Sequence, residues 1–291
     1  MQRRSFIKNA SLSVFAVSAS GFICFDGTKY TGDCETTTDI LGPFYRPNAP
    51  VRTNLVVSGA RGQKVVLSGT VKHKDCVTPL HEACVELWHC SAEGVYDNSS
   101  EKYLYRAKTF CDEKGNYEFH TVLPVPYGVG DGSTRPAHFH LLISAKGYQS
   151  LVTQLYFNGD KHISEDNWAN SSQAKRRILE IKDGSNDEKS VRFDITMLEK
   201  LPADPASLDR LTGKYVGVTD KKWTAEFFKH NNELWVKDDL YGHNFEYAGD
   251  NTFRLSGSNT SVHFDIKANG EIQLTYSGGN ASKQIVALKE K

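Results

Sequence analysis

Short apolar runs that alternate with polar residues fill residues 65–157, and they most constrain what this chain can fold into. Val65–Val71 and Cys84–Trp88 are two of these runs, and turn residues such as Thr78-Pro79 separate them. Alternation with period 2, broken by turns at short intervals, is typical of strands in a β-sandwich. We therefore predict an all-β fold for this region.

Two histidines one residue apart, His138 and His140, lie in one of the predicted strands. Side chains of a strand alternate between faces, so both imidazoles project to the same side, roughly 6.5 Å apart along the backbone. An isolated His-x-His pair is more often an ordinary strand than a metal site. Here Tyr96 and Tyr127 end neighbouring strands or turns, and they add oxygen donors to the two nitrogens.

The pattern resembles the intradiol ring-cleaving dioxygenases, non-haem ferric enzymes related to protocatechuate 3,4-dioxygenase and catechol 1,2-dioxygenase. The resemblance covers about residues 35 to 198 and implies the β-sandwich of that family. It rests on segments in the family's order: Gly42-Pro43-Phe44-Tyr45, Val85-Glu86-Leu87-Trp88, Gly94-Val95-Tyr96, Pro126-Tyr127, Arg135-Pro136-Ala137-His138-Phe139-His140 and Thr153-Gln154-Leu155-Tyr156-Phe157.

The resemblance implies an Fe(III) cofactor held by two tyrosines and two histidines. Tyr96 and His138 would be the equatorial ligands, and Tyr127 and His140 the axial ones. Two phenolates and two imidazoles suit Fe(III) better than zinc, whose usual ligands are Cys, His and carboxylates. A tyrosine with a free pKa of about 10 ionises at neutral pH only beside such a cation.

The resemblance also implies the reaction and its partners, an aromatic diol and O2. In the family the axial tyrosine, here Tyr127, leaves the metal and accepts a substrate proton, and cleavage yields a cis,cis-muconate-type diacid. Arg135 and Gln154 resemble groups that face the substrate ring and stabilise negative charge. Gly42–Tyr45 is expected at the pocket mouth. No N-terminal helical region of the catechol-specific members is evident, so the identity of the diol stays open.

Other interpretations of the same residues exist. Tyr103 and Tyr105 are rival ligands on chemistry alone, although neither stands in the family motif. A non-catalytic cell-envelope binding module would keep the sandwich without the reaction, and a copper-dependent oxidative enzyme would use the same histidines. Ferric tyrosinate absorbs broadly in the visible range, so colour distinguishes these hypotheses.

The N-terminus predicts export. Arg3 and Arg4 precede an apolar run from Ala10 to about Phe25, which resembles a twin-arginine signal peptide over residues 1–23. The run is too short and too rich in serine for a stable membrane span. We expect a periplasmic or cell-envelope protein. An alternative is that Cys24 is a lipid attachment site, although the three residues before it match the lipoprotein motif poorly. The formal net charge of zero argues against nucleic acid as a partner, and the oligomeric state is open.

Six cysteines would then meet an oxidising compartment, in which disulfides persist. They are Cys24, Cys34, Cys76, Cys84, Cys90 and Cys111. The last four fall within the predicted sandwich and allow three pairings, among which the sequence does not choose. The alternative is that they are small buried apolar residues.

The C-terminal part predicts a second all-β unit. Leu201–Ser207 contains two prolines and reads as a linker, which divides a sandwich at 35–200 from a small domain at 208–291 of unknown role. Asn269-Gly270 is a hairpin signal there. Within the sandwich we also predict a short helix near Gln173–Leu179 and a closing strand at Val191–Ile195.

Overall fold

The computed structural model describes residues 16–18, 21–25, 30–32 and 34–290, with gaps at 131, 186, 231, 238–242, 256–257, 259 and 279–280. The predicted leader therefore lies for the most part outside the described residues, and export stays a prediction. Three short strands before residue 33 form one sheet, β1 (Ala16–Ser18), β2 (Gly21–Phe25) and β3 (Tyr30–Gly32). Among the described residues, no helix has the length and apolarity to cross a membrane.

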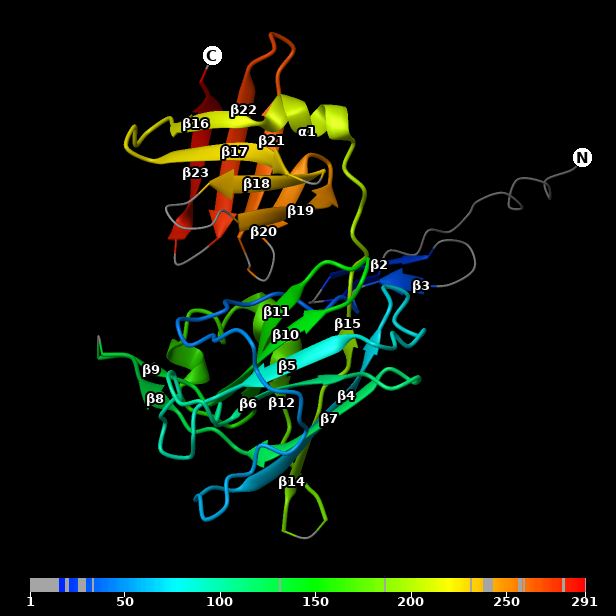
Figure 1. Ribbon diagram of the computed structural model, residues 1–291, viewed down its shortest axis with the longest axis vertical. Coiled ribbons are helices and arrows are strands. Elements are labelled where there is room, and N and C mark those ends of the chain that lie inside the picture. The colour runs from blue at the N-terminus through cyan, green and yellow to red at the C-terminus, as the bar shows by residue number, and fades with distance from the viewer. Residues whose placement is uncertain are drawn as a thin grey trace, which may run out of the picture.

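Two five-stranded sheets form the larger unit, the sandwich (Figure 1). The first has the order β12-β11-β10-β5-β6, with β5 (Cys84–Trp88), β6 (Arg106–Phe110), β10 (His138–Ser144), β11 (Leu151–Phe157) and β12 (Ile178–Leu179). The second contains β4 (Lys64–Lys72), β7 (Asn116–Val122), β13 (Lys182–Asp183), β14 (Lys189–Arg192) and β15 (Ile195–Thr196).

One apolar core joins the two sheets, as the period-2 pattern predicts. Leu67 and Phe119 from the second sheet and Val85, Phe139 and Leu141 from the first are fully buried in it. Because Phe139 and Leu141 point into the core, His138 and His140 point to the opposite face of the first sheet. The predicted all-β fold is confirmed.

A strap formed by residues 34–45 covers that opposite face. Its backbone is tied to both sheets, because the amide of Asp39 donates to Val152 O at 2.9 Å and that of Thr36 donates to Thr196 O at 3.3 Å. The strap explains why every residue of β11 is buried, although one face of this strand lies outside the core. A sheet that packs on both sides gives a water-poor setting for polar side chains.

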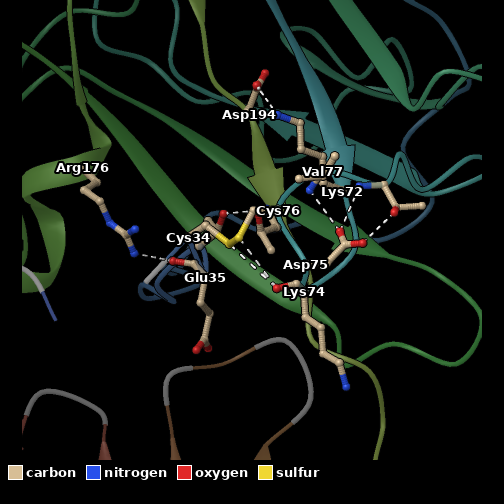
Figure 2. Close-up of a disulfide and its surroundings, with 12 residues drawn as sticks. Cys34, Glu35, Lys72, Lys74, Asp75, Cys76, Val77, Arg176 and Asp194 are labelled. Carbon is tan, nitrogen blue, oxygen red and sulfur yellow. Dashed lines mark hydrogen bonds and ion pairs between the residues drawn. A yellow bond between two sulfur atoms is a disulfide. The ribbon is translucent and has the colours of Figure 1, made fainter. Parts of the chain in front are cut away.

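A disulfide between Cys34 and Cys76 anchors the start of the strap (Figure 2). Its partner loop is ordered by Asp75, whose Oδ1 accepts from the amides of Val77 and Thr78. The pairings considered within the last four cysteines are wrong, because Cys76 pairs outside that set. Cys84, Cys90 and Cys111 are free thiols.

Two smaller elements differ from their predictions. The helix expected near Gln173–Leu179 is a 3-10 helix, η2 (Ser172–Arg177), after which the chain continues as strand β12. The closing strand is split into β14 and β15, because the amide of Thr70 on β4 donates to the side-chain Oδ1 of Asp194 and not to a backbone carbonyl. A second 3-10 helix is η1 (Ile163–Glu165).

A closed antiparallel barrel forms the C-terminal unit. Its strands follow one another around the barrel: β16 (Gly213–Gly217), β17 (Thr224–His230), β18 (Glu233–Lys237), β19 (His243–Gly249), β20 (Thr252–Leu255), β21 (Ser261–Ile266), β22 (Ile272–Gly278) and β23 (Ala281–Lys289). Sequence patterning missed β16 and β23, the pair that closes the barrel.

The predicted linker is shorter than expected, because Pro205–Ser207 belong to helix α1 (Pro205–Leu211). Asp204 caps this helix and Pro205 occupies its first turn, where proline costs no hydrogen bond. The boundaries of the two domains stay a prediction. The Asn269-Gly270 signal does mark a hairpin, but its loop is longer than two residues and only Gly270 has positive φ, +83°.

Candidate metal centre

His138 and His140 face one another across the covered side of β10. Their Nε2 atoms lie 3.1 Å apart, and both side chains are 1% exposed. His138 Nδ1 lies 2.6 Å from the carbonyl oxygen of Pro136, so Nδ1 carries the proton and donates it there. This leaves the lone pair of His138 Nε2 directed at the space between the two rings.

Tyr96 completes a triangle with the two histidines. Its Oη lies 3.4 Å from His138 Nε2 and 3.2 Å from His140 Nε2. The residue follows β5 in a loop that turns at Gly94, where φ is +77° and a Cβ would come within 3.2 Å of Tyr127 Cβ. Glycine at this position therefore lets the two tyrosines approach each other.

Tyr127 reaches the same point from a separate hairpin. It belongs to β8 (Tyr127–Gly128), which pairs with β9 (Thr134–Arg135) so that Tyr127 lies opposite Arg135. Its ring centroid is 5.4 Å from that of Tyr96 and 5.7 Å from that of His138. Unlike Tyr96, which is 8% exposed, it is only half-buried. The structure thus brings together all four predicted ligands.

Burial controls the charge of these groups. Desolvation, aided by the charge of Arg135, lowers the pKa of His138 to about 3, and the pKa of His140 also falls well below its usual value. Desolvation raises the pKa of both Tyr96 and Tyr127. The imidazoles are therefore neutral with lone pairs to donate, while the phenols need a nearby cation before they ionise.

The four residues fit an Fe(III) ion. Tyr96 has one hydroxyl proton and cannot satisfy both Nε2 atoms, and His140 Nδ1 is buried without a partner. Separations of 3.1 to 3.4 Å are those of neighbouring ligands of one ion with bonds of about 2.1 Å. Among the described residues, no group of three His, Cys, Asp or Glu forms a metal site. The phenols are therefore the remaining donors.

Aromatic packing holds the ligands in place. The Trp88 ring stacks on His140 at 4.8 Å between centroids, and Phe44 stacks on Tyr96 at 4.3 Å. Gly42, with φ +77°, passes so close that a Cβ would lie 3.1 Å from His140 Cε1. The segment expected at the pocket mouth therefore lies directly against the ligands.

The rival tyrosines lie elsewhere. Tyr103 Oη donates to the carbonyl oxygen of Pro47, and its ring lies under the guanidinium of Arg46. Tyr105 packs beside His89, a buried histidine whose nitrogens lie within hydrogen-bond distance of Cys90 O and Thr121 Oγ1. These contacts give all three rings structural roles.

Arg135 is buried in an ion pair beside the ligands. Its Nε lies 2.6 Å from Asp166 Oδ2, and its Nη2 donates to Gln154 Oε1 at 2.8 Å. The guanidinium also lies 4.8 Å from the centroid of the Trp168 ring. This ion pair is not at the surface, because the Arg135 side chain is only 9% exposed.

Gln154 lies on β11 opposite His140. Its Nε2 donates to the carbonyl oxygen of Ile40 in the strap at 2.8 Å, and its Oε1 accepts from Arg135. The Gln154 side-chain amide therefore joins the strap to Arg135. Whether Gln154 also touches a substrate stays a prediction.

Sequence reasoning missed the buried polar residues that surround Arg135 and Gln154. They are Asp39, Tyr156, Asp166 and Arg177, all buried and charged or hydroxyl-bearing. Tyr156 stands inside a motif segment already noted, which offered a signal. The others lie in the strap or near the 3-10 helices, where no periodic pattern marks a residue as buried.

A family model described as Dioxygenase matches residues 40–199, more than half of the chain. Chlorocatechol 1,2-dioxygenase of Rhodococcus opacus is 32% identical over 164 residues, which are 48% of this chain and 63% of that protein. Intradiol ring-cleavage dioxygenase prcA of Aspergillus niger is 30% identical over 201 residues, 60% of this chain and 63% of that protein. The chain thus spans less than two thirds of these curated relatives.

Solved structures share the fold of the sandwich. Catechol 1,2-dioxygenase from Acinetobacter sp. ADP1 is 26% identical with a TM-score of 0.52, covering 57% of this chain and 63% of that one. Hydroxyquinol 1,2-dioxygenase from Pseudomonas putida DLL-E4 is 22% identical with a TM-score of 0.52, covering 57% and 68%. At that identity the second likeness concerns the fold alone.

Proposed function

Because this chain belongs to the intradiol ring-cleavage dioxygenase family, we propose that it uses O2 to cleave a catechol-type diol between its two hydroxylated carbons. The product would be a cis,cis-muconate-type diacid. One observation carries the proposal: Tyr96 Oη, His138 Nε2 and His140 Nε2 converge on one point, with Tyr127 beside it.

Fe(III) is the cofactor that this donor set supports, held by Tyr96, Tyr127, His138 and His140. When bound, the ion keeps the phenolates ionised and draws electron density from a chelated diol, which makes the ring reactive toward O2. The buried neutral imidazoles are held in place beforehand by Pro136 O and the Trp88 ring. Little reorganisation is then needed at the site.

Tyr127 is the residue we expect to accept a substrate proton. It is more exposed than Tyr96 and comes from a two-stranded hairpin, whereas Tyr96 is packed under Phe44. Its phenolate oxygen takes the proton of one diol hydroxyl and the side chain moves aside. Tyr96 remains in place because its ring has no comparable freedom.

Arg135 would stabilise negative charge on the diol. Nε forms an ion pair with Asp166, and Nη2 donates to Gln154. Nη1 makes no hydrogen bond to a described residue, so it remains available to a ligand. A guanidinium held on two sides is preorganised, so its charge acts in a water-poor site without reorientation.

The names of relatives guide the substrate class. Chlorocatechol, catechol and hydroxyquinol are the diols in the names of similar proteins, and all are single aromatic rings with adjacent hydroxyls. We propose a substrate of this class, acted on outside the cytoplasm if the twin-arginine leader works as predicted. N-terminal sequencing of the protein from the periplasmic fraction tests export.

Metal analysis with a visible spectrum tests the function. We expect about one iron per chain and a broad visible band that shifts when catechol, chlorocatechol or hydroxyquinol is added. Ring cleavage should place both atoms of labelled O2 in a diacid. A protein that is colourless after loading with Fe(III), or one that binds copper instead, would contradict the proposal. Tyr105→Phe, which alters a tyrosine away from the site, is the matched control.

A further inference from the structure

A second buried ion pair lies behind Gln154 and has no part in the reaction as proposed. Asp39 Oδ2 contacts Arg177 Nη1, and the side chains are only 1% and 3% exposed. Arg177 Nη1 also donates to the backbone oxygen of Gln154 at 2.8 Å. A buried pair of this kind costs desolvation and is weak evidence for stability alone. Its placement suggests a role at the site.

The strap positions Asp39. The disulfide anchors the strap five residues earlier, and the Asp39 amide donates to Val152 O on β11. Asp39 Oδ1 accepts from the amide of Ile40, whose carbonyl oxygen in turn accepts from Gln154 Nε2. The carboxylate therefore has one orientation, with Oδ2 toward Arg177 and Tyr156.

Tyr156 is the shared neighbour of both ion pairs. Its buried hydroxyl lies 3.0 Å from Asp39 Oδ2, 3.0 Å from Gln154 Oε1 and 3.4 Å from Arg135 Nη2. The hydroxyl has one proton and two acceptors at equal distance. A hydrogen bond to a charged acceptor is stronger than one to a neutral amide, so the proton goes to Asp39.

The hydrogen bond from Tyr156 to Asp39 leaves Gln154 Oε1 available to Arg135. Because the Tyr156 proton is directed at Asp39, Gln154 Oε1 does not have to share it and accepts from Arg135 Nη2 at 2.8 Å. Tyr156 Oη then keeps a lone pair for the same Arg135 nitrogen. We propose that Asp39 is a positioning residue, which directs the Tyr156 proton away from Gln154 and so holds Arg135 in its working orientation. This inference rests on the proposed function.

A set of three variants tests it. In Asp39→Asn the charged acceptor is lost, so the Tyr156 hydroxyl turns to Gln154 and competes with Arg135. We expect kcat to fall roughly tenfold or more with KM less affected, short of the 10²- to 10³-fold expected on losing Arg135. Tyr156→Phe removes the competing proton and should cost less than roughly fivefold, the worth of one ordinary hydrogen bond.

The double variant gives the decisive result. Asp39→Asn/Tyr156→Phe should be more active than Asp39→Asn alone, because the hydroxyl that displaces Arg135 is gone. A purely structural role predicts that the two losses multiply or worsen. Iron content and the visible band should remain in all three variants, since neither residue is a ligand. Tyr117→Phe removes a buried hydroxyl bonded to Phe193 O in the core between the sheets, a cluster that contains neither Tyr96 nor Tyr127, and should leave kcat unchanged.

Unchanged turnover in iron-loaded Asp39→Asn, or a double variant no better than that single one, would overturn the inference. Should Asp39→Asn fail to fold, the double variant decides: activity near that of Tyr156→Phe supports positioning, and a loss like that of Arg135→Leu refutes it. If the parent protein cleaves no diol, the proposed function fails instead. In that case the melting temperatures of the same variants measure the energetic coupling between Asp39 and Tyr156. A double variant that is less destabilised than the sum of the two single variants supports this coupling.

Discussion

Strand β10 in the sandwich and strand β21 in the barrel have similar lengths but bury different numbers of faces. In β21 the inward residues Val262 and Phe264 are buried, while their neighbours are partly or fully exposed. In β10 the residues of both faces are buried from His138 to Leu141. The second buried face of β10 is polar, and its side chains are held by partners.

The barrel is instead organised by aromatic packing. The rings of Phe227, Phe253 and Phe264 contact one another or Tyr215, with centroids 5.5 to 5.7 Å apart. Among the described residues of the barrel, the buried polar side chains are Glu246 and Thr260. The strap covers the second face of the sandwich sheet and thereby buries its polar side chains, whereas β21 in the barrel buries one face only.

The largest expected effect comes from the tyrosine ligands. Tyr96→Phe should lose most of the iron and colour, because it removes a permanent anionic ligand. Tyr127→Phe should keep part of the iron on the other three ligands, but bind diols more slowly and with a smaller spectral change. Metal analysis and stopped-flow binding of one diol to both variants measure this. Equal rates in Tyr127→Phe and the parent would rule out its proton-accepting role.

Removal of the buried arginine should have the next largest effect. Arg135→Leu should keep iron and colour while turnover falls roughly 10²- to 10³-fold, as for one preorganised charge. Arg254→Leu in the barrel is the matched control, since this arginine is 40% exposed and pairs with Glu35 at 3.4 Å. Its turnover should be unchanged. Equal kcat in Arg135→Leu would leave Arg135 only a structural role.

Loss of the disulfide should destabilise the sandwich and spare the barrel. The two cysteines are 42 residues apart, and a loop of this length predicts that Cys34→Ser/Cys76→Ser lowers the free energy of unfolding by about 4 kcal/mol. Turnover should also decline, because the strap carries Asp39 and Phe44. Denaturant titration of the parent and of the double variant measures the loss of unfolding free energy, and an activity assay of the folded proteins measures the change in turnover. A variant with unchanged stability would mean that the strap is held by its other contacts alone.

A pH-dependent effect of smaller size is expected at Glu86, which is 9% exposed. Desolvation raises its pKa from 4.5 to about 7, opposed by the charges of Lys108 and Arg106. The folded state thus binds this proton more tightly than the unfolded state, so its contribution to stability is present below pH 4.5 and declines as pH rises through 7. Glu86→Gln should flatten this decline. The melting temperatures of the parent and of Glu86→Gln are measured at pH 5 and pH 8. If the change between the two pH values is the same in both proteins, Glu86 is not the source of the decline.

Deletion of the barrel from Leu208 onward should have the smallest effect on the metal centre. All four ligands precede Phe157, and the buried cores of the sandwich and barrel share no residue. The cut removes the contact of Glu246 with the Ser150 amide and with Lys200, so a lower melting temperature is expected. A truncated protein that folds but holds no iron would show that the barrel supports the site.

The sequence predicted the sandwich strands well, because period-2 alternation marks a face that must be buried. The alternation did not reveal elements whose partners are far away in the sequence. Strands β16 and β23 lie at opposite ends of the barrel sequence and are defined as a pair only when the barrel closes. The pairing of Cys34 with Cys76 likewise depends on where the strap crosses the sheet.

The sequence by itself was enough to identify the family and to predict the candidate ligands, because Tyr96, Tyr127, His138 and His140 stand in short local motifs. Only the tertiary structure decided what surrounds them. Asp39 and Asp166 carry no local signal, and they become partners of Tyr156 and Arg135 only after the strap and the 3-10 region fold over the sheet. Local spacing sets which atoms are available for chemistry, whereas burial and charge depend on chain segments far apart in sequence.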